Sequence, residues 1–272
     1  MSDGPGITRR AFSAAALFGP AVARHLRAAT SSEQRGREIV DRTIRALGGD
    51  GFRQMTTRTE TGRAYSFYRE QITGLSFATV YTKYLPQSDA PIRIVQRQAF
   101  GKKKEDSAVL VTGKEVWNVS YRGAKPLSDE KLKQFRDTTL HDVFYILRMR
   151  LDEPGFVADH KGKDVVENQP VETLEFVDSE NRSVTVWIHS STWLPVKQSF
   201  KHWDPAINDR REEVTRYTKY RESGNGVLWP HDVQRERDKD KVYEMYSDRV
   251  KVGEPLADSI FELPPLITIL KK

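Results

Sequence analysis

The chain has 272 residues, of which 38% are hydrophobic and 30% charged, and its formal net charge is +6 at pH 7. This composition is sufficient for a sizeable core beneath a heavily solvated surface. The absence of cysteine excludes a disulfide framework, a zinc–thiolate site, a thiol nucleophile and a lipid-modified cysteine. The modest positive charge suits contact with an anionic membrane surface and does not require a nucleic acid.

The N-terminal residues have the pattern of a bacterial twin-arginine export signal. A Thr-Arg-Arg-Ala-Phe run at residues 8–12 overlaps the start of an Ala-rich apolar stretch at residues 11–23. That stretch is too short to span about 30 Å of hydrocarbon. Small residues favour cleavage after Ala23, with Ala29 as a second candidate. We therefore predict a signal over residues 1–23 and a soluble periplasmic mature protein.

A helix is predicted at the start of the mature domain, which we place at residues 31–270. The run Ser-Ser-Glu-Gln at residues 31–34 is typical of a capping box, with Ser31 as N-cap. Apolar residues then recur at helical spacing, and Gly48-Gly49 favours termination there.

Twelve strands are predicted from β-branched and aromatic runs separated by turn residues. They lie at residues 57–70, 75–85, 92–100, 107–112, 115–121, 156–164, 170–178, 183–189, 195–203, 212–221, 227–238 and 241–252. Short connections indicate antiparallel neighbours, because a parallel crossover needs a dozen or more residues. The basic run at residues 102–104 falls in one such connection, without interleaved aromatics, and is interpreted as a hairpin loop.

One helical insert interrupts the strands at residues 128–151. Its apolar positions follow mostly three- and four-residue spacing, and Ser128 is suited to the N-cap. The sequence therefore predicts an α+β fold. A single strongly curved antiparallel sheet of about 11–12 strands would form an unclosed half-barrel, with the N-terminal helix and the insert covering its concave face.

Several segments resemble the periplasmic outer-membrane lipoprotein carriers and sorting proteins, a LolA-like family. They are residues 46–49, 183–189, 192–197, 217–221, 226–230 and 250–264. His189 stands where the family usually has Asp, and the resemblance is weak between residues 55 and 125. It implies a half-barrel whose hydrophobic concavity accepts acyl chains.

Eight apolar residues are the candidate lipid-binding set: Phe77, Tyr81, Trp117, Val119, Phe135, Val143, Phe144 and Leu147. The first four are expected to line the concavity from the strands, and the last four to fill it from the insert when no lipid is bound. Short segments at 123–126 and 154–155 are expected to serve as hinges. The alternative is that these residues form an ordinary core beneath the insert.

Motifs for catalysis, metal binding or cofactor binding are not found. The six histidines show no metal-ligand spacing, and no Gly-x-Ser-x-Gly, Gly-x-Gly-x-x-Gly or phosphate-loop motif occurs. We therefore expect a monomeric, non-enzymatic carrier of a lipid or lipidated protein, with no cofactor, metal or nucleic acid. A periplasmic sensor or interaction module on the same scaffold is the alternative, followed by an exported hydrolase with scattered carboxylates.

Overall fold

The computed structural model describes residues 1, 30–102, 106–204 and 207–271. Apart from Met1, the predicted export signal lies outside these residues, as do the residues before its two cleavage sites, Ala23 and Ala29. Lys102 is described, in the turn after a strand, whereas the two lysines that follow it are not.

Helix α1 (Ser31–Leu47) is capped at both ends by its own sequence. The N-cap is Thr30 rather than the predicted Ser31. The Thr30 hydroxyl accepts from the Glu33 N–H at 3.2 Å, and the Glu33 carboxylate accepts from the Thr30 N–H at 3.2 Å. Gly48 ends the helix with φ 118°, as expected for a left-handed C-cap. A short helix, α2 (Asp50–Gln54), follows.

In the described residues, thirteen strands form one antiparallel sheet. They are β1 (Thr57–Tyr68), β2 (Gln71–Tyr84), β3 (Ile94–Gly101), β4 (Ser107–Val111), β5 (Val116–Ser120), β6 (Gly123–Pro126), β7 (Val157–Val166), β8 (Gln169–Val177), β9 (Ser183–His189), β10 (Pro195–Asp204), β11 (Asp209–Glu222), β12 (Leu228–Arg237) and β13 (Asp240–Val252).

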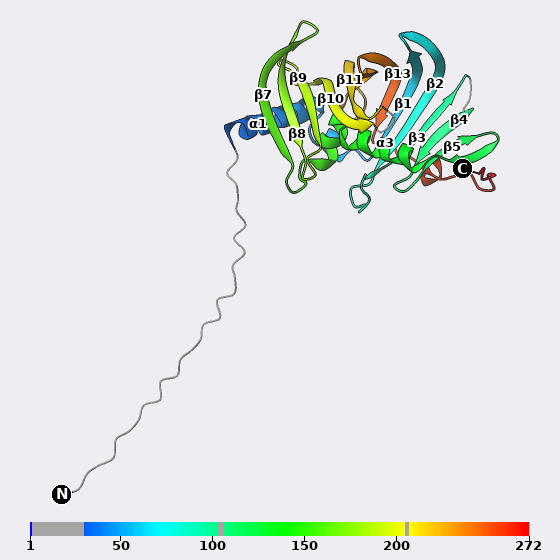
Figure 1. Cartoon of the computed structure of the whole chain (residues 1–272), viewed down its shortest axis with the longest axis horizontal. Coiled ribbons are helices and arrows are strands. Elements are labelled where there is room, and N and C mark those ends of the chain that lie inside the picture. The colour runs from blue at the N-terminus through cyan, green and yellow to red at the C-terminus, as the bar shows by residue number, and fades with distance from the viewer. Residues whose placement is uncertain (2–29, 103–105, 205–206, 272) are drawn as a thin grey trace.

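The strand order shows how the chain builds the sheet. It runs β6-β5-β4-β3-β2-β1-β13-β12-β11-β10-β9-β8-β7, so that two meanders meet where β1 pairs with β13. Strands β6 and β7 therefore lie at opposite edges, although they are consecutive along the chain (Figure 1). The helical segment between them must cross the sheet from one edge to the other.

Strand β6 is the one strand that the sequence pattern missed. Residues 123–126 were expected to be a hinge, and this expectation is wrong because they pair with β5. The C-terminal segment holds them from the other side. The Ala124 N–H donates to the Thr268 carbonyl at 2.9 Å, and the Leu270 N–H donates to the Ala124 carbonyl at 2.8 Å. These partners are about 145 residues away, so no local pattern reveals the pairing.

The insert is not the single helix predicted for residues 128–151. It consists of α3 (Asp129–Leu140), a short α4 (Val143–Tyr145) and a π-helical turn, η1 (Ile146–Arg150). The break occurs at Asp142, whose backbone is extended with ψ 124°. Its carboxylate accepts from the Tyr145 N–H at 2.8 Å, so Asp142 ends one helix and caps the next.

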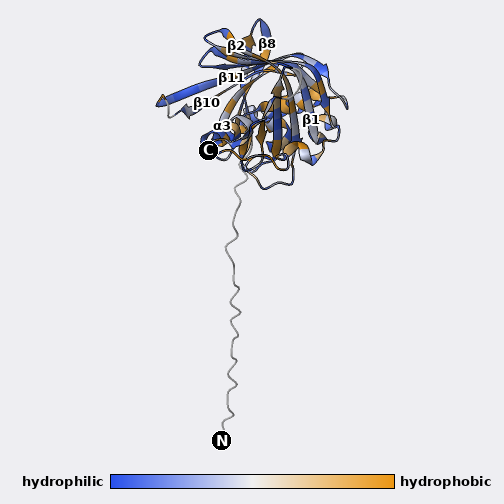
Figure 2. Cartoon of the chain, turned by 90° about the vertical axis from the view of Figure 1, so that its right-hand side faces the viewer, coloured by the Kyte–Doolittle hydropathy of each residue, from blue (hydrophilic) through white to orange (hydrophobic). Residues whose placement is uncertain are grey.

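The sheet is strongly curved and arches over the helices (Figure 2). The main core joins α1, α4 and η1 to strands β7–β12, and includes Leu147, Phe144, Val186, Tyr217 and Trp229. A short 3-10 helix, η2 (Asp258–Phe261), belongs to a C-terminal segment near β4 and β5 (Figure 1). The predicted α+β half-barrel with one curved antiparallel sheet is confirmed, with thirteen strands rather than eleven or twelve.

Candidate functional site

Strand β2 shows which residues face the helices. Tyr84 belongs to the main core beneath the insert, and its hydroxyl accepts from Arg58. Tyr81 is three residues away, and the pairing of β2 with β1 and β3 is regular between them. Successive side chains on a strand point to opposite faces. Tyr84 is therefore on the concave face, and Tyr81 is on the outer face.

Three of the predicted lining residues share this outer face. Tyr81 is aligned through Arg97 and Leu110 with Trp117, and Val119 lies in the adjacent row of pairs. They form a cluster with Ala99, Leu110 and the C-terminal residues Leu256, Ile260 and Phe261. The expectation that these strand residues line the concave face is wrong. They are covered instead by the C-terminal segment.

Phe77 is four residues from Tyr81 on β2, so it also lies on the outer face, and 58% of its surface is accessible. The remaining four candidates lie on the concave side. Val143, Phe144 and Leu147 are buried in the main core, and Phe135 is partly buried against it. The structure therefore divides the eight residues among three places and does not bring them together in one cavity.

Phe144 is held tightly. Its ring contacts Tyr217 edge-on, with centroids 5.0 Å apart, and Trp229 at 4.5 Å. The Val143 N–H beside it donates to Gln198 Oε1 at 2.8 Å, and the Tyr217 hydroxyl donates to the same oxygen. Packing against two rings, with the neighbouring backbone bound by Gln198, favours a structural role for α4 over that of a displaceable cover.

Helix α3 is held less tightly. Thr139 is its only buried residue, while Phe135 and Leu140 are partly buried. A hydrogen bond from Arg136 Nη2 to the Gly113 carbonyl is long, at 3.4 Å. The insert thus has a firmly packed part after Asp142 and a lightly packed part before it, a division that the continuous apolar spacing did not indicate.

A band of buried polar groups crosses the concave face beside the insert. Arg58 donates to the Tyr84 hydroxyl at 2.7 Å and to Glu60 at 2.7 Å, and its guanidinium lies 4.1 Å from the centre of the Trp229 ring. Burial raises the pKa of Asp142, while the Tyr145 N–H and the Arg58 charge act against that rise. Sequence spacing offered no signal for this band, because its members come from β1, β2 and the insert.

Beyond the polar band, the concave face carries a second group of apolar residues, which we call the open strip. Its members are Ala64, Ala78, Val80, Phe100, Tyr243 and Met245. Direct pairing places them on β1, β2, β3 and β13, on the same face as Tyr84. Val80, Phe100 and Tyr243 are only partly buried. The residues paired in turn with Val80 across β3, β4 and β5 end at Asn118, which is exposed, so the strip opens to solvent on that side.

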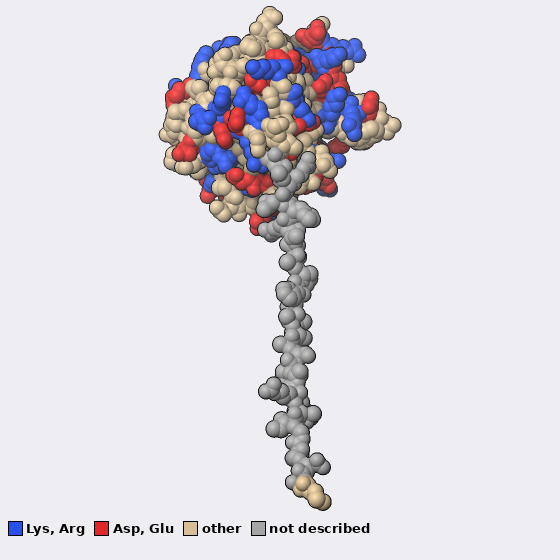
Figure 3. Space-filling model, turned by 90° about the vertical axis from the view of Figure 1, so that its left-hand side faces the viewer, with Lys and Arg blue, Asp and Glu red and all other residues tan. Residues whose placement is uncertain are grey.

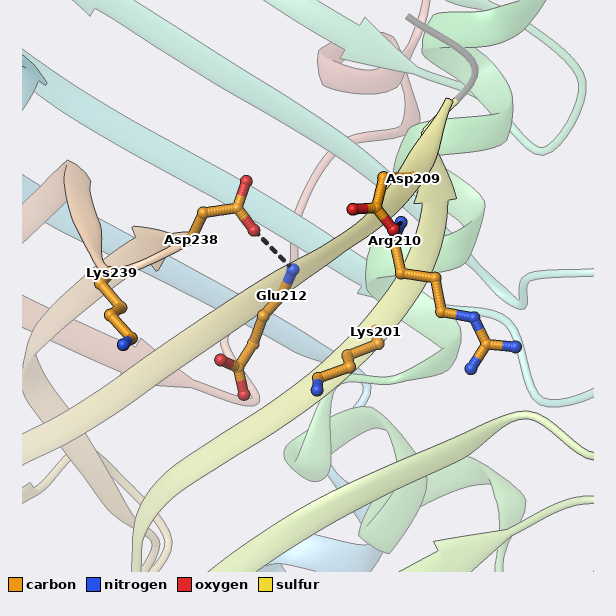
Figure 4. Close-up of a pocket in the computed structure, with 6 residues that line it drawn as sticks. All are labelled: Lys201, Asp209, Arg210, Glu212, Asp238 and Lys239. Atoms are coloured by element: carbon orange, nitrogen blue, oxygen red, sulfur yellow. Dashed lines mark hydrogen bonds between the residues drawn. The ribbon is translucent and has the colours of Figure 1, made fainter. Parts of the chain in front are cut away.

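Two polar depressions lie on the opposite, outer face. The first, of about 420 Å³, is lined by Lys201, Asp209, Arg210, Glu212, Asp238 and Lys239, whose side chains spread around an open surface and do not converge (Figure 4). The second, of about 470 Å³, contains Glu236 and Glu244. Its carboxylates are paired with cations. Burial acts to raise the pKa of Glu236, but the hydrogen bonds and charge of Arg216, together with Gln234 and Lys197, lower it below its ordinary value.

The surface around α1 and β7 carries interspersed charges of both signs (Figure 3). Within the described part of the chain, no group of three or more His, Asp or Glu side chains has a metal-binding arrangement. Over the same residues, no helix is both long and apolar enough to cross a bilayer.

Comparison with known proteins identifies the fold. No family model matches the chain. No curated protein matches it either. Solved structures do match. A domain named as an outer membrane lipoprotein-sorting protein from Vibrio parahaemolyticus is 12% identical with a TM-score of 0.56, and the match covers 85% of this chain and 97% of that one.

Two further structures agree. A LolA superfamily protein from Nitrosomonas europaea is 14% identical, with a TM-score of 0.50 over 84% of this chain and 97% of that one. The chain has a LolA-like fold. A DUF1329 family protein from Desulfovibrio piger is 10% identical, with a TM-score of 0.57 over 86% and 98%. The family resemblance of the sequence segments is thus confirmed at the level of the LolA-like fold.

Proposed function

We propose that this LolA-like protein is a non-enzymatic, monomeric periplasmic carrier that binds an acyl chain of a lipid or lipidated protein on its concave face. The observation that carries the proposal is the open strip. Apolar side chains stand there on the inner face of a curved sheet, partly exposed and next to a firmly packed core. An acyl chain gains about 0.8 kcal/mol for each CH₂ that it buries.

The lightly packed helix α3 is the element best suited to adjust to the ligand. It approaches the sheet through partly buried Phe135 and Leu140, and the extended residue Asp142 separates it from α4. Displacement of α3 would leave Phe144 and Leu147 in place. In this proposal Phe135 contacts the ligand, whereas Val143, Phe144 and Leu147 form the floor beside it.

A second surface is suited to contact with an anionic membrane. Strand β3 pairs with β2 only from Phe77 onward, so residues 71–76 extend beyond it by about 20 Å at about 3.3 Å per residue. Exposed Tyr68, Ile72, Leu75 and Phe77 lie on this hairpin. Arg63, Arg69 and Lys102 are exposed nearby. Apolar side chains with flanking cations favour an anionic lipid surface.

The carrier proposal predicts that the protein retains lipid. The full chain is expressed in a bacterial host, recovered from the periplasmic fraction, and compared by native mass spectrometry before and after organic extraction. An extractable mass that matches a lipid supports the proposal. A ligand-free protein that also fails to take up added oleyl alcohol would refute it, and would leave the sensor or interaction module as the better account.

A further inference from the structure

The open strip has a cation at its border. Val233 on β12 packs against the main core, so its side chain is on the concave face. Arg235 is two residues further along the same strand, and its side chain therefore points to the concave face as well. Direct pairing places Arg235 opposite Tyr243, a member of the open strip, and its guanidinium lies 5.6 Å from the centre of the Tyr243 ring. Despite this contact the Arg235 side chain is exposed.

In the described part of the chain, the Arg235 side chain differs from those of neighbouring arginines in forming no ion pair. Arg237 Nε donates to Glu213 at 2.7 Å, and Arg216 Nε donates to Glu236 at 2.8 Å. Within the part of the chain that the structure describes, the Arg235 side chain makes neither a hydrogen bond nor an ion pair, and its guanidinium contacts the Tyr243 ring. All five N–H donors of such a guanidinium are unused, and they stay accessible because the ring covers only one face of the guanidinium plane. This arginine is therefore suited to bind an oxyanion.

The surroundings of Arg235 favour an anion over a second cation. Asp142, on the insert, is an acidic group within electrostatic reach of Arg235, but it forms no ion pair with it. Its carboxylate is occupied by the Tyr145 N–H. Arg58, the next cation on this face, is occupied by Glu60 and Tyr84. Among the described residues, Arg235 therefore presents a cationic side chain without a bonded acidic partner at the border of the open strip, where a ligand can reach it.

We infer that the carried ligand is an anionic amphiphile, whose acyl chain lies on the open strip and whose carboxylate or phosphate is bound by Arg235. This inference rests on the proposed carrier function and adds the chemical class of the headgroup. The guanidinium would donate two parallel hydrogen bonds to the oxyanion. Tyr243 would hold the guanidinium plane in position from below.

The experiment compares three single-chain compounds with the same oleyl or oleoyl tail: oleate, oleoyl lysophosphatidate and oleyl alcohol. Dissociation constants are measured by titration with native mass spectrometry, on the wild-type full chain and on Arg235→Gln. We expect at least one anionic compound to bind about tenfold or more tightly than the alcohol, as expected for a charged hydrogen bond. Arg235→Gln should remove that advantage and leave alcohol binding unchanged.

Two further variants test whether the preference depends on the arginine geometry and on this position. Arg235→Lys should retain part of the preference, because the charge remains while the planar pair of donors is lost. Arg249→Gln removes an exposed arginine from the outer face of β13, away from the proposed membrane surface, and should change none of the constants. Equal binding of all three compounds, or an anionic preference that persists in Arg235→Gln, would overturn the inference while the carrier function stands. Failure of all three to bind would refute the carrier function itself.

Discussion

The Arg58 guanidinium donates a 2.7 Å hydrogen bond to the hydroxyl of Tyr84, and this contact joins β1 to β2 at the boundary between the main core and the open strip. The same guanidinium binds Glu60 and lies over Trp229. Charged and hydroxyl groups thus meet where the closed part of the concave face ends. Their mutual pairing keeps the boundary polar without an unpaired buried charge.

Breaking this polar band should be costly. We expect Arg58→Met to lower the free energy of unfolding by about 3–5 kcal/mol, because it leaves the buried Glu60 carboxylate without its main partner. Urea denaturation followed by circular dichroism measures the effect. The double variant Arg58→Met with Glu60→Leu should recover much of the loss. If the single variant is as stable as wild type, the band has no structural role.

Phe144 and Phe135 should respond differently to truncation. Phe144→Ala is expected to cost about 3–5 kcal/mol, because the ring is buried between Tyr217 and Trp229. Phe135→Ala on α3 should cost only about 1 kcal/mol and should strengthen uptake of oleyl alcohol. Denaturant unfolding and lipid titration of both variants make the comparison. If Phe144→Ala instead lost little stability and took up more oleyl alcohol, α4 would move together with α3.

Acid stability should depend on Asp178. The Asp178 carboxylate is buried, yet hydrogen bonds from Arg150, from Arg182 and from backbone N–H groups hold its pKa below the ordinary value of 3.8. Between the folded pKa and 3.8, the unfolded chain binds more protons than the folded protein. The free energy of unfolding must therefore fall as the pH is lowered through this interval.

The matching variant is Asp178→Asn, which should be less stable than wild type at neutral pH. Its stability should also change less on acidification, because the titrating group is gone. Urea midpoints measured between pH 7 and pH 2 give both quantities. Parallel pH curves for the two proteins would show that Asp178 does not contribute to the acid dependence.

The membrane-contact proposal concerns the β1–β2 hairpin. Replacing both Leu75 and Phe77 by Ser should weaken binding to phosphatidylglycerol-containing vesicles by about tenfold or more, since each buried apolar side chain contributes about 1.5–3 kcal/mol. Vesicle co-sedimentation gives the partition constant. Val165→Ser, which removes another exposed apolar residue on the β7–β8 hairpin, is the control. Equal binding by all three proteins would exclude the hairpin as the contact.

Much of the fold follows from local sequence signals. The turns and β-branched runs predicted twelve of the thirteen strands, because antiparallel hairpins are encoded by neighbouring residues. The exception, β6, is a four-residue strand that pairs locally with β5 but lacks a β-branched or aromatic run, and distant Thr268 and Leu270 hold it from the other side. The break at Asp142 was missed for a different reason. The continuous apolar spacing predicts one helix, whereas the Asp142 carboxylate caps α4 locally through the Tyr145 N–H, and the Val143 N–H is bound by distant Gln198.

The candidate site was predicted less well, and Tyr81 and Tyr84 show why. Alternation along a strand indicates that Phe77, Tyr81 and their paired neighbours share a face, and they do. It does not indicate which face the helices cover. Both faces of β2 and β3 carry apolar side chains here, because the main core and the open strip lie on one side and the cluster with the C-terminal segment lies on the other. The open strip is thus visible only in the assembled sheet.

The most direct test of the central claim, that an acyl chain binds on the open strip, uses two adjacent residues of β2. Val80 is on the concave face within the open strip, and Thr79 is on the outer face, with both side chains partly buried. The measurement is the dissociation constant of oleyl alcohol for Val80→Asp and Thr79→Asp, each checked for folding by circular dichroism. We predict that Val80→Asp weakens binding by about tenfold or more, because it places a carboxylate against the chain, while Thr79→Asp binds like wild type. Unchanged binding by a folded Val80→Asp variant would contradict the account.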